Sequence, residues 1–258
     1  MRFLFIFASG TIYIAAIVWP SVALVWTSIG QGVAPRDGFL FSYGQLALLG
    51  RTFLLAFAAA VICIPLSIAA GVLACSRRRS PLSVAILAAG LMCPPMVYSF
   101  GWLRFFPPGV APEIRCVAGW VLWAWPVAAI VIAAGWARAG KEPYQAATLS
   151  TSPLSAFIRV GLPALRPYIF LAAMLMFVLF FGDYGMPHAF GLQVYATELL
   201  AWASESNNTI DVLWPALLPV GITAIVLVAI LVAIRRCASH ESEQVAEIEG
   251  RPGWRVVV

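Results

Sequence analysis

Six apolar segments, each long enough to cross a lipid bilayer, constrain the fold of this chain more than any other feature. A helix needs about 20 mostly apolar residues to span a hydrocarbon layer of about 30 Å. The chain is 10% charged, whereas soluble domains carry about 25% charged residues. The sequence therefore predicts an all-α integral membrane protein with six transmembrane helices, at roughly 3–28, 52–76, 82–106, 117–138, 167–185 and 213–234.

The first segment is expected to be a retained membrane helix. Its apolar run is longer than the roughly 7–15 residues of a secretory signal, and no small-residue cleavage site ends it. Basic residues collect in cytoplasmic loops. With the N-terminus inside, twelve of the 16 Lys and Arg residues lie in the cytoplasm and four lie outside, namely Arg36, Arg51, Arg104 and Arg115. The net charge of +5 then reflects topology, and we expect no nucleic-acid partner.

This topology divides the chain into three parts. Residues 1–50 form the first transmembrane helix and an outer loop, and residues 51–234 form the membrane core. That core includes a cytoplasmic loop at 139–166. Residues 235–258 form a polar, mobile cytoplasmic tail.

The cytoplasmic loop has a helix-turn-helix pattern between Lys141 and Pro167. A short helical run (144–149) precedes a Ser-Thr-Ser break and a second short helix. The Ser152 hydroxyl is expected to cap the second helix, and Pro153 suits its first position. That helix carries one apolar face with no core of its own to enter, so the loop either rests on the bilayer surface or docks on a partner. The face consists of Leu154, Phe157 and Ile158.

The loop resembles the "EAA" loop of permease subunits of ABC importers. The family pattern is Glu-Ala-Ala, three residues, Gly, nine residues, then Ile-x-Leu-Pro. Its spacing is met in full, although Tyr144 replaces the Glu and Ser150 the Gly, and Glu142 lies two residues too early to stand in. The resemblance implies a helix that docks into a cleft of an ATPase subunit. The coupling residues that it implies are Tyr144, Gln145, Ala146, Ala147, Ser150, Pro153, Leu154, Phe157, Leu162 and Pro163.

Prolines interrupt several of the predicted spans. Pro94 and Pro95 break the third span in mid-membrane, Pro126 lies in the fourth, and Pro215 and Pro219 lie near the outer end of the sixth. Broken helices at membrane depth need neighbouring protein or a water-filled cavity to satisfy their backbone groups. The breaks therefore indicate either kinks in a packed bundle or a transport pathway. The run from Pro94 to Trp102 also resembles the third span of iron(III)-type ABC permeases.

Asp183 is the only acidic residue inside a predicted span. It lies about 25 Å along the helix from the cytoplasmic surface at 1.5 Å per residue, in the outer third of the membrane. An ionisable group at that depth faces a cavity or a partner charge. Alternatively, Asp183 ends the helix and its carboxylate is already in water. The sequence leaves both interpretations open.

Two further segments resemble the iron(III), thiamine and aminophosphonate branch of these permeases. They are Gly182-Asp183-Tyr184-Gly185-Met186-Pro187 and the run from Val194 to Leu199. Within that branch iron(III) is the first guess for the substrate, delivered by a periplasmic binding protein.

The expected translocation pathway is lined by Pro94, Pro95, Tyr98, Ser99, Asp183 and Tyr184. The outer segment 186–212 either meets the binding protein or lies at the membrane interface.

Several kinds of site are missing from the sequence. The single lysine, Lys141, is followed by Glu142, so no phosphate-binding Gly-x-x-x-x-Gly-Lys-Ser/Thr loop exists. The five cysteines and two histidines show no disulfide or metal spacing. We therefore expect no catalytic residue, no metal site and no cofactor in this chain. ATP and Mg²⁺ would be bound by the partner ATPase.

The resemblance implies a type I ABC importer permease of the bacterial inner (cytoplasmic) membrane, and the spans and charges predict a multi-pass protein with both termini in the cytoplasm. The implied partners are a cytoplasmic ABC ATPase dimer, a second permease subunit in a homo- or heterodimer, a periplasmic substrate-binding protein and membrane lipid. The alternative is a secondary transporter or channel that needs no ATPase. Few ionisable groups occur in the spans, which speaks against an ion-coupled carrier. A membrane-embedded enzyme is the third possibility.

Overall fold

The computed structural model describes Val22, Trp26 and residues 43–76, 89–107, 109–205 and 215–232. Within these residues every regular element is helical, as predicted. Four helices are long and apolar enough to cross a membrane, judged by length and composition. They are Tyr43–Cys75, Pro112–Thr148, Pro153–Phe181 and Pro215–Val232. Apart from Val22 and Trp26, the first predicted span lies outside the described residues, and so does the start of the third.

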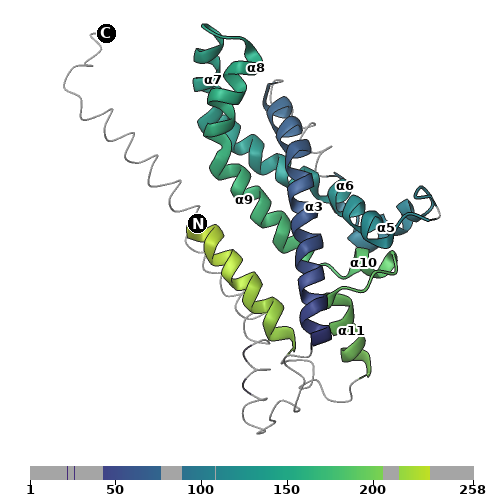
Figure 1. Ribbon diagram of the computed structural model, residues 1–258. Coiled ribbons are helices and arrows are strands. Elements are labelled where there is room, and N and C mark those ends of the chain that lie inside the picture. Colours follow the sequence, from purple (N-terminus) through teal and green to yellow (C-terminus); the bar gives the residue numbers. More distant parts are fainter. Residues whose placement is uncertain are drawn as a thin grey trace, which may run out of the picture.

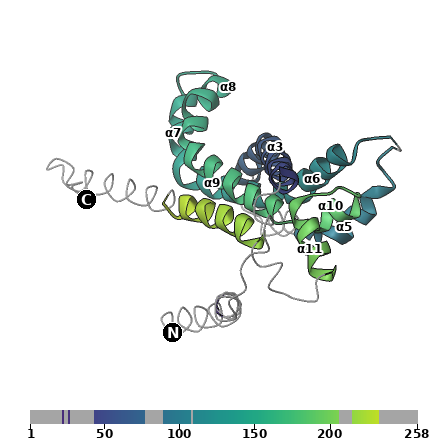
Figure 2. The same ribbon diagram turned by 60° about the horizontal axis from the view of Figure 1, so that its bottom comes forward.

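The long helices stand side by side, and the short ones gather at their two ends (Figure 1). At one end α7 and α8 project beyond α3, and at the other lie α5, α10 and α11 (Figures 1 and 2). In chain order the elements are α3 (Tyr43–Ser76), the 3₁₀ turn η2 (Gly90–Met92), α5 (Pro95–Leu103), α6 (Pro112–Gly135), the π-helical turn η3 (Trp136–Gly140), α7 (Lys141–Thr148), α8 (Pro153–Ala156), the π-helical turn η4 (Phe157–Gly161), α9 (Leu162–Phe181), α10 (Gly185–Ala189), α11 (Tyr195–Glu205) and the final helix Pro215–Val232.

Several helix boundaries differ from the prediction. Helix α3 begins at Tyr43, so residues 43–50 are helical and do not belong to an outer loop. The predicted loop 139–166 is nearly all helix, because η3 joins α6 to α7 and η4 joins α8 to α9. A π-helical turn accommodates an extra residue without ending the helix. Hydropathy marked where the apolar surface stops, and the helices continue past that point.

A stripe of small residues brings α3 and α6 together. Ala56, Ala60, Cys63, Ser67 and Gly71 follow one another at helical spacing on α3, and all are buried. A Cβ added to Gly71 would lie 2.7 Å from the backbone oxygen of Ala129. Small residues at such a crossing allow two membrane helices to approach closely.

Polar side chains on α3 reinforce the same crossing. The buried Ser67 hydroxyl shares its hydrogen between the Cys63 carbonyl of α3 at 2.8 Å and the Trp125 carbonyl of α6 at 3.1 Å. The Cys75 thiol donates to the Ala133 carbonyl at 3.2 Å. The α3–α6 pair is therefore held by packing and by hydrogen bonds.

The third predicted span is interrupted where the prolines predicted it. Cys93 and Pro94 adopt extended conformations between η2 and α5. The Trp123 indole N–H of α6 donates to the Cys93 carbonyl at 2.9 Å. A neighbouring helix thus satisfies a backbone group at the break, as irregular backbone at membrane depth requires.

A hydrogen-bond chain ties three elements at the end opposite α7 and α8. The buried Thr52 hydroxyl accepts from the Tyr195 backbone N–H at 2.9 Å and donates to the Leu48 carbonyl at 2.8 Å. The Tyr195 phenol donates to the Pro215 carbonyl at 2.9 Å. Burial raises the pKa of Tyr195, which keeps this phenol a protonated donor. The chain links α3, α11 and the final helix.

Candidate functional site

The helix-turn-helix Lys141–Ala156 forms an arm that projects past the end of α3 (Figure 1). It consists of α7, the turn Leu149–Ser152 and α8. We call the two π-helical turns η3 and η4 its base. Helix α7 has 8 residues, so the tip stands about 12 Å beyond the base at 1.5 Å per residue. The predicted helix-turn-helix is present, although its second helix is continuous with α9 through η4.

One tryptophan organises the base of the arm. The Trp136 side chain is 4% exposed. Its ring centroid lies 5.2 Å from that of Tyr144 and 5.9 Å from that of Phe157. A Cβ added to Gly140 or Gly161 would come within 2.5 Å or 2.9 Å of the indole. The two glycines therefore leave the space that the indole fills. The ring thereby connects α7 with η4, which leads out of the hairpin.

The structure corrects the predicted docking face. Phe157 does have an intramolecular core to enter, because its half-buried ring packs against Trp136 and the buried cluster of the bundle. Leu154 and Ile158 remain 70% and 54% exposed, and Leu149 at the tip is 90% exposed. The exposed apolar residues of the hairpin are thus Leu149, Leu154 and Ile158. Sequence periodicity grouped Phe157 with Leu154 and Ile158 because helical spacing does not show what a neighbouring helix covers.

Hydrogen bonds close the turn without unusual backbone angles. The N–H groups of Ser150 and Thr151 donate to the Ala147 carbonyl at 3.2 and 3.1 Å, and the Thr151 hydroxyl donates to it at 3.0 Å. No described non-glycine residue has a positive φ. The turn therefore does not need the conformational freedom of glycine, which explains why Ser150 fits where the family pattern has Gly.

The start of α8 differs in one detail from the prediction. Ser152 occupies the N-cap position, but its hydroxyl makes no capping hydrogen bond. Pro153 occupies the first turn, as predicted, and its fixed φ suits that position. The Ser152 carbonyl accepts from the Ala156 N–H at 2.9 Å. Backbone geometry starts this helix, and the expected side-chain cap is absent.

The remaining predicted coupling residues divide by exposure. Gln145, Ala146, Ser150 and Pro153 are exposed, and Ala147, Leu162 and Pro163 are half-buried. Tyr144, which stands where the family pattern has Glu, is half-buried against Trp136. At this position the chain uses an aromatic ring for packing. The coupling roles of all these residues stay predictions.

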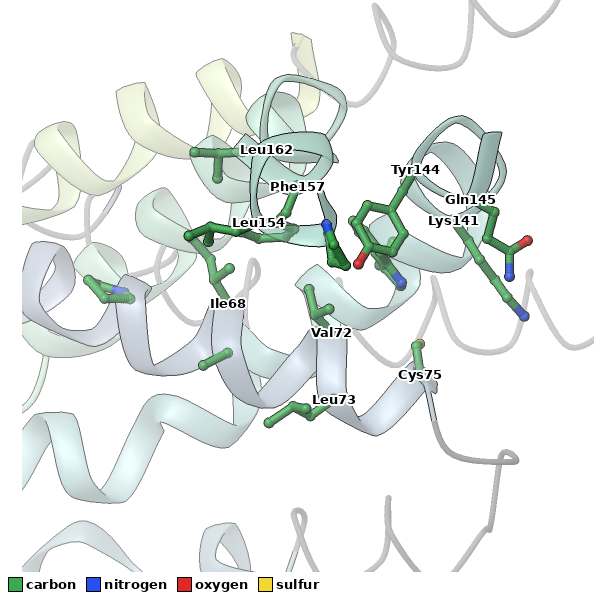
Figure 3. A pocket seen from close by; sticks show the side chains of 14 residues that line it. Ile68, Val72, Leu73, Cys75, Lys141, Tyr144, Gln145, Leu154, Phe157 and Leu162 are labelled. Atoms are coloured by element: carbon green, nitrogen blue, oxygen red, sulfur yellow. The ribbon is translucent and has the colours of Figure 1, made fainter. Parts of the chain in front are cut away.

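An apolar groove runs between α3 and the arm (Figure 3). Its volume is about 920 Å³. In Figure 3 the side chains of Lys141 and Gln145 lie at the same end as Cys75, while Ile68 and Leu162 lie toward the other end. The groove is lined by Pro65, Ile68, Ala69, Val72, Leu73, Cys75, Trp136, Lys141, Tyr144, Gln145, Pro153, Leu154, Phe157 and Leu162.

Asp183 lies at the opposite end of the bundle, two residues after α9 ends at Phe181. It thus follows the helix end, as one of the two interpretations held, but its carboxylate is not free in water as that interpretation also held. Its half-buried carboxylate is held by protein donors. The Trp120 indole donates to Oδ2 at 2.7 Å, and the backbone N–H groups of Gly185 and Met186 donate at 2.9 and 3.2 Å. The carboxylate thereby ties α6 to the start of α10.

The structure brings together the two regions expected to line a pathway. Helix α10, which follows Asp183, packs on α5, so a Cβ on Gly185 would lie 3.2 Å from the Met96 Cβ. Ser99 is buried, and its hydroxyl donates to the Pro95 carbonyl. Tyr98 is half-buried, and Tyr184 is 48% exposed. A pathway role for these residues and for Pro94 and Pro95 stays a prediction.

Sequence reasoning missed two tryptophans that organise the ends of the bundle. Trp120 holds Asp183, and Trp136 holds the arm. The one local signal for Trp136 was Gly140 four residues later, since a glycine at that spacing leaves room for a large ring. Among the described residues, no group of three or more His, Cys, Asp or Glu side chains is arranged to hold a metal ion.

Comparisons with known proteins give little further information. No protein-family model and no curated protein matches the chain. Among solved structures the chain is similar to one described as an amino acid ABC transporter with histidines. The likeness has a TM-score of 0.49 at 14% identity and covers 81% of this chain and 99% of the other. A likeness at this level does not assign a function to the chain.

Proposed function

We propose that this chain is the transmembrane permease subunit of an ATP-driven ABC importer in a bacterial inner membrane. The single observation that carries the proposal is the arm, a helical hairpin that projects past the end of α3 (Figure 1) and exposes Leu149 and Leu154 at 90% and 70%. An exposed apolar tip on a well-packed base is suited to insertion into a partner's cleft. The match of this segment to the spacing of the family's coupling loop supports the same function.

The charges of the described residues support a cytoplasmic position for the arm. Near the arm lie four basic residues and one acidic residue: Arg138, Lys141, Arg159, Arg166 and Glu142. At the other end lie three basic and four acidic residues: Arg51, Arg104, Arg115, Glu113, Asp183, Glu198 and Glu205. Lys and Arg, not the acidic residues, set the orientation of membrane proteins, and the described four against three agrees in direction with the twelve against four of the whole sequence. An ATPase in the cytoplasm would then meet the arm directly.

The proposed coupling follows from this position. An ATPase dimer that binds the arm more tightly in one state of the permease shifts the permease toward that state. Burial of Leu149 and Leu154 in the partner's cleft would contribute about 1.5–3 kcal/mol each. A second permease subunit would complete the pathway, and a periplasmic binding protein would deliver the substrate at the opposite end.

The experiment measures ATP hydrolysis that copurifies with the tagged full-length chain from its native membrane. The double variant Leu149→Asp/Leu154→Asp should lose this activity while its thermal unfolding is unchanged, because both side chains are exposed. Phe105→Asp is the matched control, because Phe105 is 76% exposed at the opposite end. Retained hydrolysis in the double variant would contradict docking by the arm. A wild-type chain without any copurifying ATPase would favour the secondary transporter or channel.

For the cargo we propose a small solute selected by the binding protein, with iron(III) first and thiamine or an aminophosphonate next. This choice rests on the resemblance of the Pro94–Trp102 and Gly182–Pro187 segments to that branch of permeases. Exchange of only the binding protein's ligand pocket should change the transported substrate in vesicles. Tight binding of substrate to the purified permease without a binding protein would contradict this division of labour.

A further inference from the structure

We propose that the groove between α3 and the arm binds one anionic phospholipid, with its acyl chains along α3 and its phosphate at Lys141. The inference goes beyond the proposed transport function and does not need an ATPase partner. It rests on the distribution of polarity along the groove, on its size and on the position of Lys141.

The groove changes from apolar to polar along its length. On α3 it is lined by Pro65, Ile68 and Val72, which lie within a candidate membrane span. Lys141 and Gln145 lie at the end near Cys75, where α3 finishes (Figure 3). From Pro65 to Cys75 the helix rises about 15 Å at 1.5 Å per residue, about half of a 30 Å hydrocarbon layer. The groove thus has the polarity and depth of one bilayer leaflet.

The size of the groove also fits a lipid. Its volume of about 920 Å³ holds roughly thirty groups the size of a water molecule or a methylene at about 30 Å³ each. The two acyl chains of a phospholipid contain about that many carbon atoms. Since Leu73 is 66% exposed in the groove, chains packed along α3 would cover apolar surface that the described residues leave open.

Lys141 provides the preference for negative charge. It makes no ion pair with any described residue, and its side chain is exposed at the polar end of the groove. Gln145 lies one turn further along the same helix and adds an amide donor. Basic side chains beside membrane helices on the cytoplasmic side recognise anionic head groups in this manner. A zwitterionic lipid would fill the groove equally well but would gain less from the ammonium group.

The test uses the full chain in vesicles that contain equal amounts of phosphatidylglycerol and phosphatidylcholine with identical acyl chains. Native mass spectrometry then counts the lipids that stay bound after extraction. The wild type should retain phosphatidylglycerol in preference to phosphatidylcholine. Lys141→Gln should lower that preference roughly fivefold, the loss expected for one basic residue near an anionic surface. Lys141→Arg should preserve it.

Two controls separate the head-group contact from general effects. Arg159→Gln removes a positive charge at the same end from a residue that does not line the groove, and it should leave the preference unchanged. Ala69→Phe fills the groove and should reduce retention of both lipids, whereas Ala47→Phe, at an exposed alanine near the other end of α3, should not. Soluble glycerol phosphate should not compete, because it lacks the chains.

Three results would overturn the proposal. They are an unchanged lipid preference in Lys141→Gln, full lipid retention in Ala69→Phe, and a wild-type chain that retains no lipid. The last two would indicate that a protein segment or a second copy covers the groove. Neither Lys141 nor Ala69 belongs to the exposed arm tip, so ATPase copurification should persist in these variants. A failure of lipid binding is thereby distinguished from a failure of the proposed transport function.

Discussion

The two ends of the bundle are held by different kinds of interaction. At the base of the arm, Trp136 fills a space left by Gly140 and Gly161 and contacts two further aromatic rings. At the opposite end, directional hydrogen bonds hold the elements, with three donors on Asp183 and a chain through Thr52 and Tyr195. The opposite end also has ring contacts, such as Trp120 stacked on Phe180. It therefore differs from the arm base by the side-chain hydrogen bonds that fix distances and angles there.

The largest expected effect comes from removing the ring at the arm base. Trp136→Ala should destabilise the protein by about 3–5 kcal/mol, because a buried ring is lost and its cavity cannot collapse between glycine backbones. The midpoint of thermal unfolding in detergent measures this. Trp202→Ala, at a half-buried tryptophan on α11, should cost clearly less. An equal or smaller loss at Trp136 would remove the distinction between the two ends.

The hydrogen bonds to the Asp183 carboxylate should contribute measurably to the stability of the end opposite the arm. Asp183→Asn keeps the shape, but its amide nitrogen cannot accept a hydrogen bond, so a buried donor loses its partner at a cost of about 1–3 kcal/mol. Trp120→Phe removes the indole donor alone. A double-mutant cycle of these two changes should give a coupling of about 0.5–3 kcal/mol. Additive effects would mean that the indole and the carboxylate act independently.

Two apolar residues of the arm should separate packing from docking. A fully buried Phe→Ala change costs about 3–5 kcal/mol. Phe157→Ala should destabilise the isolated chain by less than that, because the ring is only half-buried. Leu154→Ala should stay within about 0.5 kcal/mol of the wild type, since its side chain is 70% exposed. Thermal unfolding of both variants checks this. Equal destabilisation would place Leu154 in the core of the arm.

The smallest expected effect concerns the turn. Ser150→Gly restores the residue of the family pattern but should destabilise the arm by less than about 1 kcal/mol, since glycine adds chain entropy without relieving a positive φ. Amide hydrogen exchange of the Ala147–Thr151 turn measures it. Slower exchange in the variant would show that the serine is strained.

Local features of the sequence predicted more of the fold than of the site. The break at Pro94 and the start of α8 at Pro153 follow from proline itself, which acts within one turn. The continuity of α6 into α7 was missed, because hydropathy falls at Arg138 while the helical hydrogen bonds continue through η3. The partner of Asp183 was missed because Trp120 is far away in sequence. Such long-range pairs leave no local pattern.

The unbroken run from Pro112 to Thr148 has a mechanical consequence. Its 37 residues follow a helical path about 55 Å long at 1.5 Å per residue, which bends between α6 and α7 (Figure 1). Trp120 lies near one end and Tyr144 near the other, about 36 Å apart along that path. If Trp120 acts as the pivot, a tilt of about 10° carries the neighbourhood of Tyr144 through at most about 6 Å. A slight rocking about Asp183 would then become a stroke of up to one helical turn at the arm.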